Sequence, residues 1–416
     1  MNDQKYDWIV VGGGIAGISV AEILCREGKS VLIIEKNSQI ASETSKVFHE
    51  WLHTGALYSL VPDNLITTRY LLGAMDDLLD YYSFYNRMNL TPSENGLLIG
   101  DYGWFNNDRI EYRYRVRKLN PIWMSMVSRA MNIGHLINTH DWLRRNAGGS
   151  EYDSAKIKLK YSFDRISEQF SSSDKFLTLE SPDFTMNSRI LMGDLLSTAV
   201  HNGLEIAASE PVESIFESGS GAKVETSANL YESDNVVICS PDVVSKEFNV
   251  PINTGYAPMA VVDNVPESEK SFVELDYYTK TCINLLKKEN RVGLAGGITV
   301  NKEKDIKPYL KYIIMEHKKR NPEIRVVDDY VGLKRELVQD KDKRNYLYHI
   351  NQHSSKIWSV VLGKFSLSFS MAPEFYRRVY VQNPKKLSEQ GANELGSSIL
   401  SKTSWREIID NNQRDN

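Results

Sequence analysis

The chain has 416 residues, of which 41% are hydrophobic and 25% are charged, and its formal net charge is −4. This composition is typical of a globular protein of two or three domains, and the small negative charge gives no general attraction to nucleic acid or to anionic membranes. The three cysteines, Cys25, Cys239 and Cys282, lack CxxC spacing, which argues against a disulfide framework or a zinc site and fits a reducing cytoplasm.

The first predicted unit is a strand, turn, helix and strand over residues 7–35, DWIVVGGGIAGISVAEILCREGKSVLIIE. Gly12 allows a tight turn, Gly14 lets the chain approach a pyrophosphate, and Gly17 lets the helix lie close to the sheet. Glu35 ends the second strand, where its carboxylate can accept hydrogen bonds from both ribose hydroxyls. This spacing predicts a dinucleotide-binding βαβ unit.

The identity of the dinucleotide is a choice between FAD and NAD. Glu35 disfavours NADP because its carboxylate would repel a 2′-phosphate. A unit that starts within the first ten residues favours FAD, since flavoproteins of this kind open with the nucleotide fold. The apolar run from Trp8 to Cys25 contains Gly12, Gly13, Gly14 and Glu22. We therefore expect a buried strand and helix there, and no integral membrane segment.

Helical and strand patterns alternate through the rest of the chain. We expect helices at 64–85, 187–202, 306–319 and 366–378, and strands at 96–100, 111–117, 204–208, 234–240, 256–262, 292–300 and 357–361. A hairpin is predicted around residues 219–221, and the strands at 256–262 and 292–300 are assigned to a second sheet. The residues after Gln382 are polar, and we expect a loose tail at the C-terminus.

Several sequence blocks occur in the order found in one family: GGGIAG, ETSKVFHEWLHTGALY, NSRILMGDLLSTAVHNGLEIAASEPVESI, DNVVICS, RVGLAGGITVNKEKD, DDYVGLKREL and LGKFSLSFSMA. With them the chain resembles the FAD-dependent oxidoreductases of the D-amino-acid oxidase and glycerol-3-phosphate dehydrogenase type, which include L-2-hydroxyglutarate oxidases and sarcosine-type amine oxidases. The resemblance implies an α/β fold with a Rossmann-like FAD-binding domain and a discontinuous α+β substrate domain. The expected boundaries are 1–62, 186–250 and 328–385 for the FAD domain, 63–185 and 251–327 for the substrate domain, and 386–416 for a polar tail.

The resemblance also assigns cofactor contacts to matching residues. The ADP half of FAD would lie against Gly12, Gly14, Ile15, Ala16, Gly17, Glu35 and Lys36. Thr44 and Ser45 would meet the phosphates or ribitol, and the backbone of Val212 would contact the adenine. Gly363 and Lys364 would lie by the flavin pyrimidine, where helix N–H groups and a cation stabilise the negative charge of the reduced ring.

Candidate catalytic residues come from two of the same blocks. His53 is the candidate base, because an imidazole titrates near neutrality and the matching loop in the family approaches the isoalloxazine. A covalent link to the flavin through His53 or His49 is an alternative, and so is a histidine that only packs within the loop. Where relatives read Gly-Leu-Arg-Pro, this chain has Gly-Leu-Lys-Arg, so Lys334 takes the place of the substrate-binding arginine and Arg335 is its neighbour.

The arginines of the segment EYRYRVR form a second cationic feature. Arg113, Arg115 and Arg117 alternate with other residues, so a strand would place all three on one face. Such a stripe could bind a carboxylate or a phosphate. A solvated strand face is the interpretation that we favour.

The predicted function is that of an enzyme that removes a hydride from a carbon bearing a hydroxyl or amine group of a small organic substrate. The electron acceptor and the oligomeric state stay open. The alternatives are a flavin-binding accessory protein without turnover and an NAD-dependent dehydrogenase. No His, Asp and Glu set has ligand spacing such as HExxH, so we expect no metal. The sequence also lacks a GxSxG elbow and any nucleic-acid recognition motif.

Overall fold

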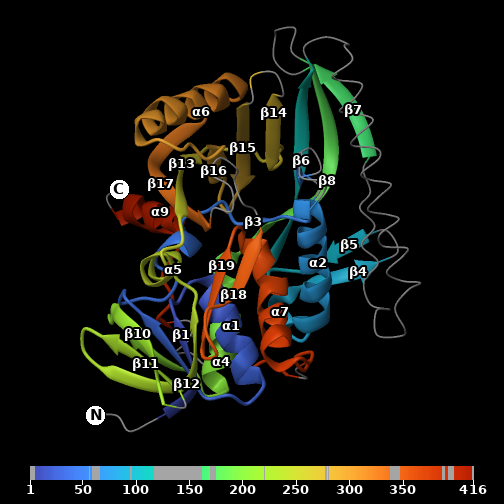
Figure 1. The fold of residues 1–416 in the computed structure, drawn as a ribbon. Helices are drawn as coiled ribbons and strands as arrows, with labels where there is room; N and C mark the ends of the chain where they lie inside the picture. Colours follow the sequence, from blue (N-terminus) through green and yellow to red (C-terminus); the bar gives the residue numbers. More distant parts are fainter. Residues whose placement is uncertain are drawn as a thin grey trace.

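The computed structural model shows two large β-sheets, one in the lower and one in the upper half of Figure 1, with helices packed against them. The described residues are 5–55, 57–58, 66–93, 96–116, 162–168, 175–219, 221–276, 279, 281–337, 347–386, 389–391 and 398–414.

The first sheet has a parallel core in the order β9, β2, β1, β12 and β19. β18 pairs antiparallel with β19, and the hairpin of β10 and β11 pairs with the first half of β12. This confirms the predicted α/β class and the predicted hairpin. The strands are β1 (Lys5–Val11), β2 (Val31–Glu35), β9 (Glu205–Ala208), β10 (Val212–Ser218), β11 (Gly221–Thr226), β12 (Leu230–Ile238), β18 (Tyr348–Gln352) and β19 (Ile357–Leu362).

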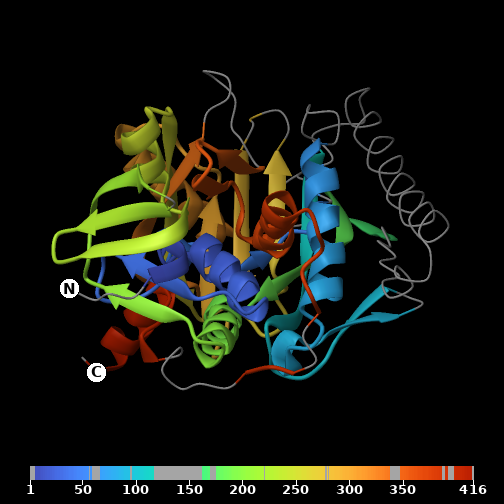
Figure 2. The same ribbon diagram turned by 60° about the horizontal axis from the view of Figure 1, so that its bottom comes forward.

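Both faces of this sheet are covered, which explains the nearly continuous apolar run of β1. Successive side chains of a strand point to opposite faces. Trp8 and Val10 pack with α1 (Ile15–Arg26), α4 (Ser188–His201) and α7 (Ser368–Tyr380), which lie next to one another as the blue, green and orange-red helices of Figure 2. Ile9 and Val11 face the other side, which the β10–β11 hairpin and α5 (Pro241–Phe248) cover.

The second sheet has the order β17, β13, β16, β15, β14, β6, β8 and β3, and β7 pairs with the outer side of β8. Its helix α6 (Ile306–Arg320) packs Leu310 and Ile313 against β13 and β16. The strands are β3 (Trp51–Leu52), β6 (Phe105–Val116), β7 (Ser162–Glu168), β8 (Lys175–Met186), β13 (Ile252–Asp263), β14 (Phe272–Asp276), β15 (Thr281–Lys287), β16 (Gly293–Gly297) and β17 (Arg325–Leu337).

The remaining described elements flank the two sheets. α2 (Ile66–Tyr81) packs against α7, and β4 (Leu90–Ser93) forms a small hairpin with β5 (Gly96–Ile99). Each helix and strand predicted from the sequence is matched by one of the elements named above. β17, which lies mostly within the segment expected to belong to the FAD domain, pairs with β13 in the second sheet instead.

The C-terminal segment contradicts the prediction of a loose tail. Residues Ser404–Arg414 form helix α9, which packs against β17. Trp405 is only 7% exposed and packs together with Val292, Ile408 and Ile409. The prediction relied on the polar composition of the segment. It missed an amphipathic helix in which Trp405, Ile408 and Ile409 recur at the spacing of one helical face.

The favoured interpretation of a solvated arginine face is also wrong. The side chain of Arg113 is 5% exposed; it forms ion pairs with Glu111 at 3.0 Å and Glu269 at 2.9 Å and lies 4.1 Å from the centre of the Phe272 ring. Arg115 pairs with Glu274 at 3.1 Å. Arg117 lies outside the described residues. Acidic residues of β14 and of the loop before it neutralise these cations. The ion pairs therefore link β6 to β14 in the second sheet.

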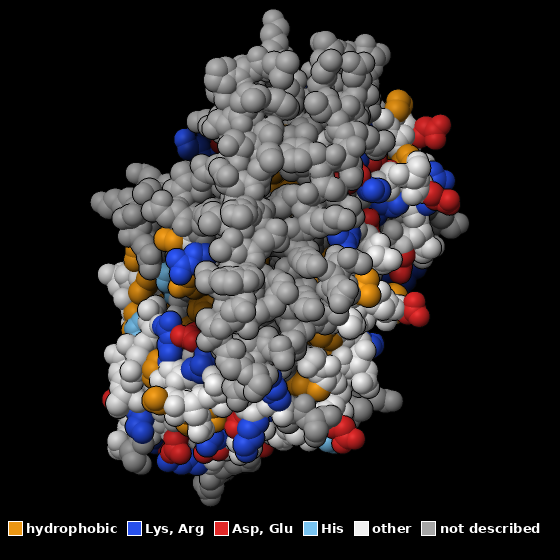
Figure 3. Space-filling view, turned by 90° about the vertical axis from the view of Figure 1, so that its right-hand side faces the viewer, with side chains coloured by type: hydrophobic (Ala, Val, Ile, Leu, Met, Phe, Trp, Pro, Cys, Tyr) orange, Lys and Arg blue, Asp and Glu red, His pale blue; other side chains and the backbone are white. Residues whose placement is uncertain are grey.

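The described surface carries charges of both signs. On the face shown in Figure 3, Lys and Arg side chains and Asp and Glu side chains are both visible among the described residues. Among the described helices, none is both long and apolar enough to cross a membrane.

Candidate functional site

Two adjoining cavities lie where the first sheet meets the second. The smaller, of about 210 Å³, opens beside the start of α1 and is lined by Gly12, Gly14 and Glu35. The larger, of about 410 Å³, reaches the strands of the second sheet and is lined by His53. Both cavities share the lining residues Ile15, Thr44, Ser45, Arg335 and Leu362. Together they form one elongated space, which suits a long ligand.

The glycine-rich turn at the smaller cavity leaves no room for side chains. A Cβ atom on Gly17 would lie 1.9 Å from the carbonyl oxygen of Gly12, so the helix could not approach the turn. Gly12 itself has φ +104°, a conformation that favours glycine. Ser45 Oγ accepts a hydrogen bond of 3.0 Å from the backbone N–H of Ile15. The first turn of α1 is thus held next to the loop that carries Thr44 and Ser45.

Glu35 is fixed at the end of β2, as expected. Its carboxylate is nearly buried and accepts hydrogen bonds from the backbone N–H of Gly13 at 2.8 Å and of Asn37 at 2.9 Å. Lys36 forms an ion pair with Glu43 at 2.6 Å. Glu35 and Lys36 line the smaller cavity, as do Ala16 and Val212. The structure therefore brings the predicted contacts of the ADP half together around one space.

His53 lies in the larger cavity, between two aromatic rings. Its ring centre is 4.2 Å from that of Trp51 and 5.4 Å from that of Tyr58. Its backbone N–H donates to Ser366 Oγ at 3.0 Å, which ties the loop to the segment preceding α7. Burial lowers the pKa of His53 to about 4, so the imidazole is neutral at pH 7 and can accept a proton.

Asp183, on β8, organises the loop around His53. Its fully buried carboxylate accepts hydrogen bonds from Trp51 Nε1 at 2.8 Å, from Thr54 Oγ1 at 2.6 Å and from the Tyr112 hydroxyl at 2.6 Å. Burial alone would raise the pKa of Asp183, but His53 and these donors lower it below its usual value. The residue is therefore a carboxylate anion that fixes the position of the loop.

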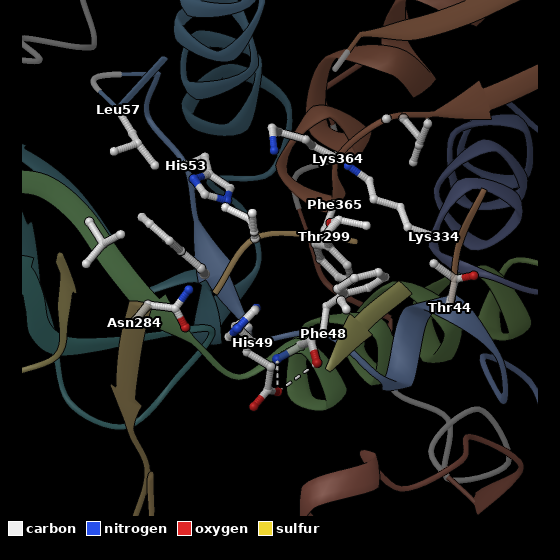
Figure 4. Close-up of a pocket in the computed structure, with 18 of the residues that line it drawn as sticks. Thr44, Phe48, His49, His53, Leu57, Asn284, Thr299, Lys334, Lys364 and Phe365 are labelled. Carbon is white, nitrogen blue, oxygen red and sulfur yellow. Dashed lines mark hydrogen bonds between the residues drawn. The ribbon is translucent and has the colours of Figure 1, made fainter. Parts of the chain in front are cut away.

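A second histidine, His49, lines the same cavity. Burial, followed by the positive charge of Lys288, lowers the pKa of His49 to about 3. Within the described part of the chain, His49 Nε2, His53 Nδ1 and Asn284 Oδ1 are buried polar atoms without a hydrogen-bond partner, and all three residues line the cavity. Figure 4 shows His49 and Asn284 close together below His53. Unsatisfied buried polar atoms are costly, so a bound polar ligand would stabilise this arrangement.

Two lysines enter the cavity opposite His53. Figure 4 shows the side chains of Lys334 and Lys364 extending towards it from the other side. Lys334 pairs with Glu336 at 2.5 Å, and the Lys364 amino group lies 4.3 Å from the centre of the Tyr58 ring. Arg335 points to the opposite face of β17 from Lys334 and pairs with Asp242 on α5. Both predicted substrate cations line the larger cavity, and the charge of Lys334 is among those that lower the pKa of His53.

Asp183, Asn284 and Glu50 were not predicted from the sequence. Asp183 and Asn284 reach His53 and His49 from strands far along the chain, and no motif marks them. Glu50 stands between His49 and Trp51, and its contacts only become visible in the fold. Among the described residues, no group of His, Cys, Asp and Glu has the arrangement of a metal site.

A sequence model described as "DAO: FAD dependent oxidoreductase" matches residues 7–299. The chain belongs to this family of FAD-dependent oxidoreductases. Among curated proteins, the mitochondrial L-2-hydroxyglutarate dehydrogenase of Arabidopsis thaliana is 30% identical over 82 residues, which is 20% of this chain and 16% of that protein. In these matches the chain spans about a sixth of the length of the curated relatives.

Solved structures of the same fold match nearly the whole chain. L-α-glycerophosphate oxidase from Mycoplasma pneumoniae, with FAD bound, has a TM-score of 0.66 at 14% identity and covers 94% of this chain and 98% of its own. L-amino acid deaminase from Proteus vulgaris has a TM-score of 0.63 at 16% identity and covers 91% of each chain. Identities this low establish the fold, and the family membership decides for FAD over NAD.

The residues present in this oxidoreductase fit FAD. The bare backbone of the glycine turn and the start of α1 would face the pyrophosphate, Glu35 the ribose, and Val212 the adenine. Gly363 and Lys364 line the larger cavity, which has the volume for the flavin ring and a small substrate. The unsatisfied polar atoms of His49 and Asn284 lie in this same space.

Proposed function

We propose that the protein is an FAD-dependent oxidase or dehydrogenase that acts on a carbon bearing a hydroxyl or amine group of a small organic substrate. The observation that carries this proposal is the neutral, largely buried His53 in the larger cavity, which is continuous with the smaller cavity at the glycine-rich turn. Bound FAD supplies the hydride acceptor for such a reaction. The chain itself must bind the substrate, orient it and take up one proton.

His53 is the proposed proton acceptor. Its Nδ1 atom lies on the side of Asp183, so the proton from the substrate heteroatom would arrive at Nε2. The nearby Asp183 carboxylate would stabilise the imidazolium that forms, while Trp51 and Tyr58 hold the ring in place. His49 faces the Asn284 side chain and not Asp183, which makes it a hydrogen-bonding group in this proposal.

The substrate that we propose carries an anionic group. Lys334 and Lys364 place two ammonium groups in a cavity whose other lining residues are largely apolar, among them Phe48, Leu57 and Val273. Glu336 balances the charge of Lys334, and the Tyr58 ring accommodates that of Lys364. A carboxylate or phosphate of the substrate would be anchored by Lys334, in the place of the arginine that relatives use.

We also place the protein in the cytoplasm. Cys25, Cys239 and Cys282 are buried free thiols in the structure, as is usual in a reducing compartment.

The proposal is tested by the absorbance spectrum of the purified protein and by anaerobic mixing with hydroxy acids, amino acids and polyol phosphates. We expect a flavin spectrum that one substrate class bleaches. Acid precipitation that leaves the flavin in solution would exclude a covalent link through His49 or His53. A flavin that neither these donors nor sulfite can modify would favour the accessory protein instead. A colourless protein without affinity for FAD would contradict the proposal.

A further inference from the structure

The C-terminal residues 399–414, which we call the C-terminal clasp, contact the loop at 40–53 that lines both cavities. The clasp itself contributes no residue to the lining of either cavity within the described chain. It holds the loop from outside at three separate points. One point adjoins the glycine turn through a hydrogen bond from Ala41 to Gly13, and the other two lie at Lys46, next to Ser45, and at Glu50, next to His49.

The first point is backbone pairing next to the glycine turn. Ile40 forms a parallel bridge with Leu400, in which the N–H of Ser401 donates to the Ile40 carbonyl at 3.0 Å. Ser401 Oγ also donates to the Ala41 carbonyl at 2.8 Å. Ala41 in turn donates its N–H to the Gly13 carbonyl at 2.9 Å. The clasp is thus connected to the pyrophosphate turn through a single residue.

The second point is an ion pair next to Thr44 and Ser45. The Lys46 amino group lies 2.9 Å from the Glu407 carboxylate and also donates to its other oxygen at 3.1 Å. The side chain of Lys46 is 22% exposed, so solvent screens this pair only in part. Lys46 directly follows the two residues expected to contact the phosphates or ribitol.

The third point is a buried hub at Glu50. The Trp405 indole N–H donates to Glu50 Oε2 at 2.8 Å, and Lys288 pairs with the same oxygen at 2.8 Å. The backbone N–H and hydroxyl of Ser188 donate to Oε1 at 2.9 and 2.7 Å. Four donors from three distant segments therefore converge on one carboxylate.

Glu50 also has a left-handed backbone, with φ +62°. This conformation is unfavourable for a residue with a Cβ atom, and it persists only where surrounding contacts enforce it. Glu50 lies between His49 and Trp51, so a relaxed backbone at this position would turn both side chains away from their places in the cavity. Trp405 contributes one of the contacts that enforce the conformation.

We propose that the C-terminal clasp positions the 40–53 loop for FAD, with Trp405 and Glu407 as positioning residues. The inference rests on the FAD binding of the proposed function and not on its catalytic step. Free of the clasp, the loop would have to be ordered by FAD itself, and the cofactor would bind more weakly.

The test compares full-length variants. Trp405→Phe keeps an aromatic ring but removes the indole N–H donor, and Glu407→Gln removes the charge that faces Lys46. The matched control is Lys402→Gln, which removes an exposed ion pair with Asp410 inside the clasp without touching the loop. The dissociation constant is measured by titrating each apoprotein with FAD and following flavin fluorescence, and hydrogen exchange of residues 40–53 is measured in the same preparations.

We expect Trp405→Phe to raise the dissociation constant of FAD roughly ten-fold and Glu407→Gln by a smaller factor. Amide exchange in the loop should become faster in both variants, and Glu407→Asp should restore part of the affinity. Lys402→Gln should behave as the wild type. Unchanged FAD affinity and unchanged loop exchange in Trp405→Phe and Glu407→Gln would overturn the positioning role of the clasp and leave the proposed function intact. A wild-type protein that does not bind FAD would overturn the proposed function as well. Exchange of the loop reports on the clasp even if a variant loses FAD completely.

Discussion

The Asp183 carboxylate lies 3.8 Å from Nδ1 of His53, and it is already held by Trp51, Thr54 and Tyr112. This distance exceeds that of a hydrogen bond, so a small movement of the imidazole would close the contact when the ring gains a proton. Burial lowers the pKa of His53 to about 4, and Asp183 opposes that shift. The carboxylate therefore decides how strong a base His53 is.

Replacing Asp183 by asparagine should weaken this base. Without the negative charge the pKa of His53 falls further, so the acidic limb of the rate of anaerobic flavin reduction moves to lower pH. The maximal rate should fall by roughly 10- to 1000-fold, because the imidazolium loses its counter-charge. Stopped-flow absorbance between about pH 3 and pH 8 measures both effects, because the acidic limb lies near the lowered pKa of about 4.

The control for this variant is Asp194→Asn. Asp194 is a buried carboxylate of the same kind, since it accepts the indole N–H of Trp104 at 2.8 Å and pairs with Arg87, but it lies outside both cavities. Its replacement should lower stability and leave the pH profile in place. Equal shifts of the profile in both variants would contradict the assignment of Asp183 as the partner of His53.

His53→Asn tests the base directly. The variant should bind FAD normally and reduce it roughly 100- to 10,000-fold more slowly, the usual contribution of a general base. His201→Asn, which replaces an exposed histidine at the end of α4, should reduce the flavin at the wild-type rate. If His53→Asn also keeps that rate, His53 only packs within its loop and the base lies elsewhere.

Gly17→Ala tests the glycine-rich turn that is expected to bind the dinucleotide. The added Cβ would lie 1.9 Å from the Gly12 carbonyl oxygen, which is backbone and cannot move without opening the turn. We expect the variant to lose FAD, as measured by the ratio of flavin to protein absorbance after purification. Gly73→Ala in α2 meets nothing within 4 Å and should keep its FAD while gaining about 0.5–1 kcal/mol of stability. Full flavin content in Gly17→Ala would contradict the geometry of the turn.

The glycine-rich turn could be predicted from the sequence because its physical constraints are local. Gly12, Gly14, Gly17 and Glu35 lie within one βαβ unit, so their spacing alone specifies the turn, the helix start and the position of Glu35 at the end of β2. The surroundings of His53 were only partly predictable. Asp183 reaches His53 from β8, about 130 residues further along the chain, and its role arises from burial and from donors on other strands.

Polar patterns were the weakest guide. Arg113 was expected to face solvent, because its burial depends on Glu269 and Phe272, which the sequence gives no reason to place beside it. The C-terminal segment was expected to be loose, because one tryptophan and two isoleucines were outweighed by its charged residues. In both cases a long-range partner reversed what local composition indicated.

Three histidines whose pKa values are lowered in the folded state should make the protein sensitive to acid. The pKa of His49 is lowered to about 3, that of His53 to about 4 and that of His317, on α6, to about 3, in each case chiefly by burial. In the unfolded chain these groups titrate near 6.5. Below that pH the unfolded state binds protons that the folded state does not, so the stabilisation present above pH 6.5 is lost as the pH falls towards 4.

Each of these histidines should lower the free energy of unfolding by about 2 kcal/mol between pH 7 and pH 5. His317 separates this effect from cofactor binding, because it is buried on α6 and lines neither cavity. We therefore expect urea unfolding of FAD-loaded His317→Gln to show a shallower decline with falling pH than the wild type, by close to one proton in its slope. Parallel curves for the two proteins would show that His317 is protonated in the folded state, against the lowered pKa that its burial implies.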